Sequence, residues 1–502
     1  MGSPSNDKPR YSQVLAAAGV VALLTAAFVL AGLRRPDAAS PDSVVMESIC
    51  QHLLDNTTVG RQALVSSIWW PPLPVLLRLP LVAAFGVESW PAPSLIVSAL
   101  FGAAAFVLLG RILRAWGIGW LRFLILAAML VNPAYLRECC SGSSATTVVF
   151  LSIVVMGGLV EWVSERKFRS LIYFGCGAAL LALTSFEMGL WLVLLFLLLV
   201  LDQCFALAPR SQKEAVLILG LLPCLYAAGL WVLMNWLIMG DGLYYLRSLF
   251  SGGLRWNGAG PAAAGMEGLP LWAAAAALAA IAISVFLRAK AGAYAGVLVV
   301  SVAALALVLN AFGLLCNPAP VRLALFPLCL VAVACVVRAL QPASRGLAGL
   351  AAAVPLVLVL LTAPGLQAAA VPARETARGD ADLWRSRIRT HVLGRSPYAK
   401  VFVCGYDSFR LLGPAGGGVF VHTLDFNFNK VKDDYYGHTL FVLVHRPVGR
   451  SAADSIHWQY ENVYALGYRN TLYDGDWGDW RLFEIIQAPR FGVFLKEAGK
   501  KR

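Results

Sequence analysis

Long apolar segments recur through the first 366 residues of this 502-residue chain and constrain its fold more than any other feature. Each holds roughly 18 to 24 residues, enough to cross a ~30 Å hydrocarbon layer as a helix. Only 14% of the residues are charged and the mean hydropathy is +0.69, whereas soluble domains carry about 25% charged residues. The sequence therefore predicts a polytopic α-helical membrane protein. About eleven spans are expected, over residues 13–33, 93–113, 118–136, 145–163, 170–185, 188–207, 214–238, 270–287, 294–313, 322–340 and 347–366.

Basic residues in short loops predict the orientation of these spans. They form six clusters: Lys8 and Arg10; Arg111, Arg114 and Arg122; Arg166, Lys167 and Arg169; Arg210 and Lys213; Arg288 and Lys290; Arg338 and Arg345. All six fall on one face if the N-terminus is cytoplasmic, and only Arg34 and Arg35 depart from this pattern. We therefore expect a multi-pass protein of the inner or plasma membrane. The first span is interpreted as an anchor rather than a cleaved signal.

With this topology, the loops 34–92 and 239–269 and the C-terminal residues 370–502 lie on the extracytoplasmic side. The net charge of +13 does not predict nucleic-acid binding, because much of the excess lies in cytoplasmic loops, where it serves orientation and contact with anionic lipid. The extracytoplasmic face is therefore where function is expected.

The 34–92 loop carries two predicted interfacial elements. Residues 41–54 place apolar side chains at helical spacing, which predicts an amphipathic helix with Ser40 or Asp42 as its N-cap. Residues 69–86 are apolar but interrupted by four prolines and preceded by tryptophans, which predicts a second element that dips into the interface instead of crossing. This loop is the expected location of the chemistry, because it holds carboxylates at the membrane surface.

The C-terminal residues 370–502 predict a separate α/β domain. A polar, arginine-rich helical run extends to His391, and strands are predicted over 400–404, 418–422, 440–445 and 480–486. Aromatic and acidic residues between 458 and 480 suit stacking against sugar faces, and they equally suit ordinary core packing. Five histidines lie here without a recognisable metal-ligand spacing.

Short motifs follow the spans in a defined order. They are Pro41-Asp42, Trp70-Pro71-Pro72-Leu73-Pro74, Asn132-Pro133 with Ser141-Gly142-Ser143 after it, Leu183-Thr184-Ser185-Phe186-Glu187, and Pro318-Ala319-Pro320-Val321-Arg322. In order and sidedness they resemble the GT-C superfamily of polytopic glycosyltransferases, within it the branch of protein mannosyltransferases and lipid A aminoarabinose transferases. The likeness covers most of residues 1–366. It implies a GT-C-like membrane domain that transfers a sugar, with inversion, from a polyprenyl-phosphate donor to an acceptor hydroxyl.

The resemblance implies that Asp42, which aligns with the family's outer-loop aspartate, is the general base. The family often has a second acid directly after the first, but Ser43 stands there in this chain. Glu47 and Asp55 are the expected substitutes for that second acid.

Arginine is the expected ligand of the donor phosphate, because a guanidinium binds phosphate oxygens in a bidentate way. Arg322 is the first candidate, at the outer mouth of a span where related enzymes often have an Arg-Tyr pair, although Leu323 follows it here. Arg247 and Arg255 in the 239–269 loop are secondary candidates. Arg78 and Arg137 are interpreted instead as interfacial anchors.

The acceptor is expected near three other side chains. Glu187 lies between two apolar segments, where a carboxylate is costly unless it has a partner or faces a cavity. Trp458 and Trp477 are the aromatic candidates in the C-terminal domain. The acceptor itself is left open as a lipid, a polysaccharide or a protein. No metal ligands are predicted, and a divalent metal is left open as a cofactor.

Two other classes of function are compatible with many spans and few outer charges. One is a transporter or flippase of a lipid-linked sugar, which the scarcity of ionisable residues in the spans and the absence of an inverted repeat disfavour. The other is a noncatalytic membrane sensor or scaffold with an outer binding domain.

Overall fold

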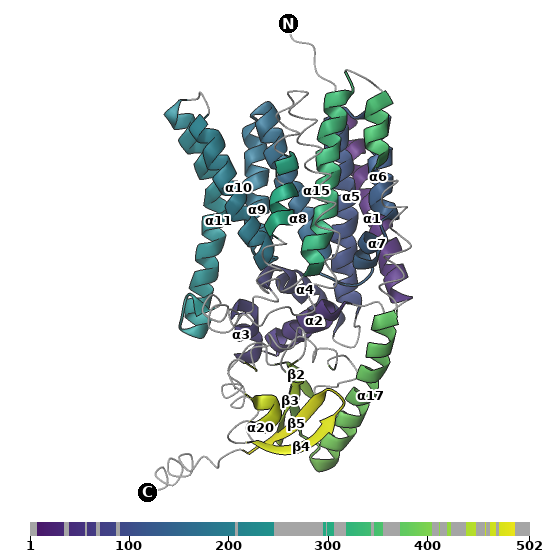
Figure 1. The fold of residues 1–502 in the computed structure, drawn as a ribbon, viewed down its shortest axis with the longest axis vertical. Coiled ribbons are helices and arrows are strands. Elements are labelled where there is room, and N and C mark those ends of the chain that lie inside the picture. The colour runs from purple at the N-terminus through teal and green to yellow at the C-terminus, as the bar shows by residue number, and fades with distance from the viewer. Residues whose placement is uncertain are drawn as a thin grey trace. The chain divides into compact units, whose positions relative to one another are not determined.

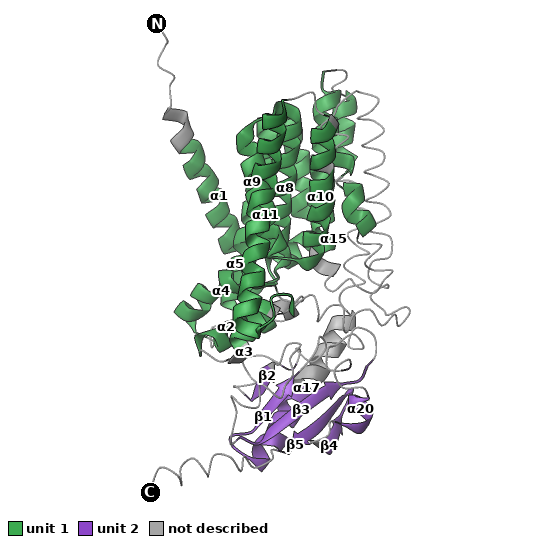
Figure 2. Cartoon of the chain, turned by 90° about the vertical axis from the view of Figure 1, so that its left-hand side faces the viewer, with its two compact units in different colours: residues 1–376 green, residues 377–502 purple. Residues whose placement is uncertain are grey.

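The computed structural model describes residues 8–34, 40–55, 58–66, 71–86, 91–205, 209–244, 295–305 except 298, 318–342, 346–354, 372–403, 411, 419–422, 438–447, 457, 462–467 and 471–486. The chain divides into two compact units, residues 1–376 and 377–502 (Figure 2). Each unit is described by itself below.

Among the described residues, six helices of unit 1 are long and apolar enough to cross a membrane, so the chain is a multi-pass membrane protein, as predicted. They are α1 (Lys8–Leu33), α5 (Ala92–Ala115), α8 (Ala145–Glu165), α10 (Phe186–Phe205), α11 (Arg210–Met239) and α15 (Pro318–Leu340) (Figure 1). A shorter apolar helix, α9 (Phe168–Ala182), lies between α8 and α10 in sequence. The expected span 270–287 lies outside the described residues, and 294–313 and 347–366 are described in part, so the number eleven stays a prediction.

The segment predicted as a span over 118–136 is not one straight helix. A short 3-10 turn, η3 (Gly119–Leu121), leads into α6 (Arg122–Val131), and α7 (Pro133–Cys139) follows after a bend of 66°. Pro133 causes the break, because it has no backbone N–H and disfavours helical geometry at the residue before it. Asn132 then starts the new helix, its Oδ1 accepting from the backbone nitrogens of Ala134 (2.9 Å) and Tyr135 (3.3 Å).

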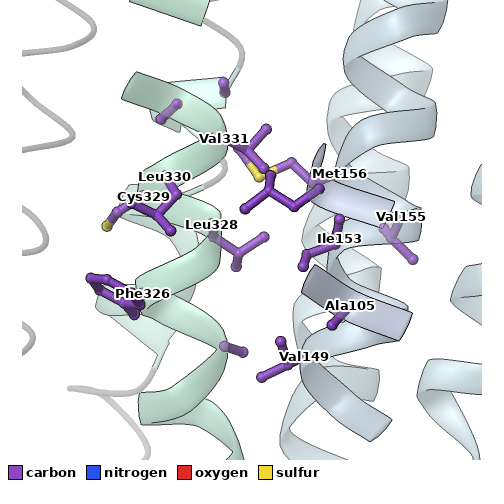
Figure 3. Close-up of a cluster of buried hydrophobic side chains, with 14 of the residues drawn as sticks. Ala105, Val149, Ile153, Val155, Met156, Phe326, Leu328, Cys329, Leu330 and Val331 are labelled. Carbon is purple, nitrogen blue, oxygen red and sulfur yellow. The ribbon is translucent and has the colours of Figure 1, made fainter. Parts of the chain in front are cut away.

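Helices α8 and α15 form the centre of unit 1 and run parallel. Their C-terminal ends meet where Arg338 Nη2 lies 4.0 Å from Glu165 Oε1. Figure 3 shows buried Leu328 and Val331 of α15 facing the side of α8 that carries Ile153 and Met156. Because both helices are about 30 Å long, their N-terminal turns also lie at one common end of the bundle.

Charged side chains gather at the end of unit 1 where α8 and α15 finish. Arg166 Nη1 lies 3.0 Å from Asp202 Oδ2, Arg169 Nη2 lies 3.4 Å from Glu161 Oε1, and Lys167 pairs with Glu165. The arginine and lysine side chains are partly exposed, so each pair stabilises the fold by at most about 1 kcal/mol. This is the end predicted to be cytoplasmic, and its orientation in a membrane stays a prediction.

The opposite end carries the short helices between α1 and α5 and is called the α2 end below. These helices are α2 (Pro41–Leu54), α3 (Thr58–Ser66) and α4 (Pro72–Phe85) (Figure 1). The elements expected at 41–54 and 69–86 are therefore present as α2 and α4, while α3 was not predicted. Trp231 Nε1 and Asn235 Nδ2 of α11 both donate to the carbonyl of Val65, at 2.8 and 3.0 Å, and so attach α3 to the bundle.

Unit 2 is a small α/β unit, and its described residues form a five-stranded sheet in the order β2-β1-β3-β5-β4. Its elements are α17 (Pro372–Arg395), β1 (Lys400–Val403), β2 (Phe420–His422), β3 (Leu440–His445), α20 (Val463–Leu466), β4 (Thr471–Trp477) and β5 (Trp480–Ile485). β1 pairs in parallel with β2 and β3, while β5 pairs antiparallel with β3 and β4. The α/β class is as predicted. β4 was missed because polar Asp474, Gly475 and Asp476 interrupt its apolar alternation.

The helix α17 is held against the β4–β5 hairpin by charged contacts. Asp474 is almost fully buried; His391 Nε2 lies 2.7 Å from its Oδ2, and Arg395 pairs with it and also, at 2.9 Å, with Glu484. Gly478 turns the hairpin with φ of +64°, and a side chain there would strike the ring of Trp384. These contacts join the helix to the sheet inside unit 2.

Candidate active site at the start of α2

Asp42 is the second residue of α2 and lies in its first turn. Pro41 opens the helix, which suits proline because the N–H it lacks would have no helical partner there. The carbonyl of Ser40 accepts from the backbone nitrogen of Ser43 at 3.0 Å and from its hydroxyl at 2.5 Å. Asp42 is thus inside the helix rather than its N-cap, and of the two N-caps predicted, only Ser40 directly precedes the helix.

The residues on both sides of Asp42 contact the segment between α7 and α8. The backbone N–H of Ser40 donates to the carbonyl of Ser141 at 2.6 Å. Gly142 has φ of +75°, and a Cβ built there would lie 3.0 Å from Ser43 Cβ and 2.9 Å from Ser94 Cβ. Only glycine fits this approach of the three chain segments without displacement. The first turn of α2 is therefore seated directly on the backbone at 141–142.

The 139–142 backbone is in turn fixed to α5. Ser98 is fully buried, and its hydroxyl lies 3.1 Å from the carbonyl of Cys139, to which it donates. The same oxygen accepts from the N–H of Gly142 at 3.1 Å. One hydroxyl thereby satisfies two backbone groups that would otherwise be buried without partners.

Arg78 is fully buried in α4, so its interpretation as an interfacial anchor is wrong. Its Nε donates to Ser94 Oγ (3.1 Å), its Nη1 to the carbonyl of Pro74 (2.7 Å) and its Nη2 to the carbonyl of Gly142 (2.8 Å). The three acceptors belong to α4, α5 and the segment before α8. By contrast Arg137 is partly exposed and pairs with Glu138 at 3.3 Å.

Glu47 is buried on the face of α2 that packs on α5. Its Oε1 accepts from the backbone N–H of Ser94 at 3.0 Å, one of the free N–H groups in the first turn of α5. Burial raises the pKa of this carboxyl above its ordinary value of 4.5, an effect partly offset by the Ser94 hydrogen bond and the charge of Arg78. Ser94 thus lies between the two buried charges and contacts both.

The raised pKa of Glu47 predicts a pH dependence of stability. The folded protein keeps the Glu47 proton at pH values where the unfolded chain has lost it, so the contribution of this group is fully present below pH 4.5 and is lost as the pH rises through the raised pKa. Glu47→Gln keeps an acceptor for Ser94 but does not titrate. The unfolding temperature of the wild type in detergent should therefore fall relative to that of Glu47→Gln between about pH 4.5 and pH 7. Parallel curves for the two proteins would contradict this expectation.

Asp55 lies at the far end of α2 from Asp42. It is exposed and accepts from Gln51 Nε2 at 2.9 Å. With a rise of 1.5 Å per residue, the two backbone positions are about 20 Å apart, so the two carboxylates do not share one reacting atom. If Asp55 takes part in chemistry, it does so at a place separate from the first turn of α2.

Glu187 is buried in the first turn of α10 and accepts from the hydroxyl of Ser185 at 2.8 Å. The preceding turn is attached to α4, because the N–H of Leu73 donates to the carbonyl of Leu183 at 3.1 Å. The motif that contains Glu187 therefore meets the helix of Arg78 at the α2 end.

The remaining predicted residues are described only in part. Arg322 lies near the start of α15, at the end of the bundle where α8 also begins, but its side chain, like that of Asp42, is outside the described residues. Arg247, Arg255 and Trp458 lie outside them altogether.

Trp477 ends β4 in unit 2. Its ring centroid lies 6.4 Å from that of Trp384 and 5.1 Å from that of His391, both on α17. Trp477 therefore packs against α17, which fits the core-packing alternative that the sequence left open beside acceptor binding. Among the described side chains, no three His, Cys, Asp or Glu residues come together as ligands of a metal ion.

Neither a protein-family model nor a curated protein matches the sequence. Among solved structures, the chain is similar to ArnT from Cupriavidus metallidurans in the apo state, with 12% identity and a TM-score of 0.39 over 95% of this chain and 98% of that chain. A second structure of that protein, bound to undecaprenyl phosphate, aligns over the same shares of both chains with 13% identity and a TM-score of 0.36. The functional proposal below therefore rests on the residues of this chain.

Proposed function

We propose that this protein is an inverting membrane glycosyltransferase that moves a sugar from a polyprenyl-phosphate donor to an acceptor hydroxyl on the extracytoplasmic face. One observation carries the proposal: the turn that contains Asp42 is seated on the backbone at 141–142, at the end of the bundle where the helix of Arg322 begins. The same segments carry the motifs that resemble the GT-C superfamily. The proposal is supported by the backbone positions of Asp42 and Arg322, which are distant in sequence but lie at the same end of the bundle.

The reaction needs few groups. The carboxylate of Asp42 takes the proton of the acceptor hydroxyl as its oxygen attacks the anomeric carbon. The bond from that carbon to the phosphate oxygen breaks on the opposite side, and the electron pair leaves with the polyprenyl phosphate. Because the second pKa of a phosphate monoester is about 6, this leaving group needs no strong general acid.

The remaining predicted residues have roles in binding. Arg322 is proposed to neutralise the donor phosphate, with Arg247 and Arg255 as further candidates, because fixed positive charge stabilises the charge that develops on the leaving group. Glu187, Trp458 and Trp477 remain the candidates for the acceptor. Glu47 is proposed to support α2 through Ser94 rather than to act as a base, and Asp55 is the alternative base.

Wild-type protein in proteoliposomes tests the proposal with a panel of radiolabelled polyprenyl-phosphate hexoses and pentoses. We expect the labelled sugar of one donor to be transferred to envelope glycolipid, polysaccharide or protein. Polyprenyl phosphate should be released only when an acceptor is present. Movement of an intact donor across the bilayer without acceptor would instead indicate a flippase. Binding without transfer or movement would indicate a sensor or scaffold.

A further inference from the structure

Arg78 is the one arginine with a fully buried side chain among the side chains that the structure describes. Burying a guanidinium is costly unless hydrogen bonds replace its water, and an arginine near a membrane surface ordinarily extends its head group to water instead. Here the side chain is turned inward onto two carbonyls and a hydroxyl. A residue held at this cost links three segments of the fold, α4, α5 and the backbone before α8.

The bonds of Arg78 lead to the turn of Asp42 in two steps. The first is the hydrogen bond from Nη2 to the carbonyl of Gly142, at 2.8 Å. The second is the seat of α2 on that backbone, through the hydrogen bond from Ser40 to Ser141 and the close approach of Ser43 to Gly142. Ser40 and Ser43 enclose Asp42 in sequence, so a shift of the carbonyl at 142 moves the turn that carries the carboxylate.

We propose that Arg78, Ser94 and Gly142 form a buried latch that sets the position of Asp42, with Arg78 as a positioning residue that acts through Gly142 and does not touch the substrate. The role in transfer rests on the proposed function, whereas the mechanical link between Arg78 and α2 does not. The latch requires arginine in particular, because its planar fork reaches three acceptors in fixed directions while lysine has a single nitrogen at the end of a flexible chain.

Hydrogen–deuterium exchange of the full-length protein in nanodiscs tests the mechanical link. In Arg78→Lys, exchange in the peptide that contains Ser40 and Ser43 should become at least ~10-fold faster than in the wild type, because local opening of the seated turn becomes easier. Arg210→Lys is the matched control, since Arg210 is an exposed arginine paired with Glu214 at the opposite end of the bundle from α2. Its exchange in the same peptide should equal that of the wild type.

A transfer assay with the same variants distinguishes a role of Arg78 in positioning Asp42 from a role in binding the donor. With the polyprenyl-phosphate sugar that gives the highest wild-type rate, Arg78→Lys should lower kcat by roughly 10- to 100-fold and leave the donor KM within about two-fold, because a small displacement of a catalytic group has effects of this size. If Arg78→Lys does not accumulate, Ser98→Ala is the second variant, because it removes the acceptor for the N–H of Gly142. It should also speed exchange around Ser40 and Ser43 and lower kcat, with smaller effects than Arg78→Lys.

Each outcome decides the proposal. Unchanged exchange around Ser40 and Ser43 would overturn the latch, whatever the protein catalyses. Faster exchange with an unchanged kcat would overturn the positioning role, and a raised donor KM with an unchanged kcat would make Arg78 a binding residue instead. If no donor in the panel is used by the wild type, the proposed function fails, while the exchange measurement still decides the link between Arg78 and α2.

Discussion

Asp42→Asn is expected to lower kcat for sugar transfer by about 10²- to 10⁴-fold, the range that a positioned general base contributes. Asparagine has nearly the same shape as aspartate and is tolerated in the first turn of a helix, so α2 should keep its seat on the 141–142 backbone. The amide cannot take the proton of the acceptor hydroxyl. The loss should therefore appear in kcat, with the donor KM almost unchanged and normal abundance in the membrane.

The measurement uses initial rates in proteoliposomes with equal amounts of wild type, Asp42→Asn and Asp42→Ala. Glu214→Gln is the control, because Glu214 is an exposed carboxylate paired with Arg210 at the opposite end of the bundle from α2. Asp55→Asn decides between the two candidate bases, since their backbone positions are about 20 Å apart along α2. Wild-type rates in both Asp42 variants would remove Asp42 from the mechanism, and a loss confined to Asp55→Asn would transfer the role to Asp55.

Gly142→Ala is expected to destabilise unit 1 by about 2–5 kcal/mol. A left-handed backbone conformation costs a residue with a Cβ about 1–2 kcal/mol. The added carbon would also lie 2.9 Å from Ser94 Cβ and 3.0 Å from Ser43 Cβ, and an overpacked contact of this kind typically costs a further 1–3 kcal/mol or so. The structure can relieve the clash by moving α2 away from α5. The unfolding temperature and the rate of transfer should therefore fall together.

Thermal unfolding in detergent, followed by tryptophan fluorescence, measures the change in stability. Gly229→Ala is the matched control, because Gly229 lies inside α11 and a Cβ there meets nothing within 4 Å. Alanine favours a helix interior over glycine by roughly 1 kcal/mol, so this variant should be as stable as the wild type or slightly more stable. If the two alanine variants unfold at the same temperature, Gly142 is not the close contact that the geometry describes.

Hydrophobicity and proline placement predicted most of the fold. The length of the apolar segments identifies α1, α5, α8, α10, α11 and α15 as spans. The prolines between residues 71 and 80 indicate that α4 is not a membrane-crossing helix. The bend at Asn132 was not predicted as a change of direction, because an apolar window averages over a single proline. α3 was missed because a segment of nine residues that contains Gly60, Arg61 and Gln62 is too short for its helical period to stand out in the sequence.

The sequence singled out Asp42 as the catalytic carboxylate, which stays a prediction, but it did not indicate the contacts that hold the turn of Asp42 in place. The motifs with Asp42 and Gly142 were recognisable in sequence, whereas the bonds of Arg78 join residues that are 16 and 64 positions away. Nothing in a local pattern indicates such pairings. A general signal was present nonetheless, because a lone arginine in an apolar, proline-rich run has to reach either water or buried acceptors. Snorkelling was the commoner of the two solutions and proved wrong here.

The seating of α2 on the backbone at 141–142 also sets an order of assembly. Ser43 leaves the ribosome about a hundred residues before Gly142, and α5, α6 and α7 lie between them in the chain. Contacts between residues so far apart form only after the intervening chain has been made and inserted. The turn of Asp42 therefore cannot complete its contacts until residues 141–142 have been made, and a nascent chain that ends before Ser141 has no backbone on which this turn can pack.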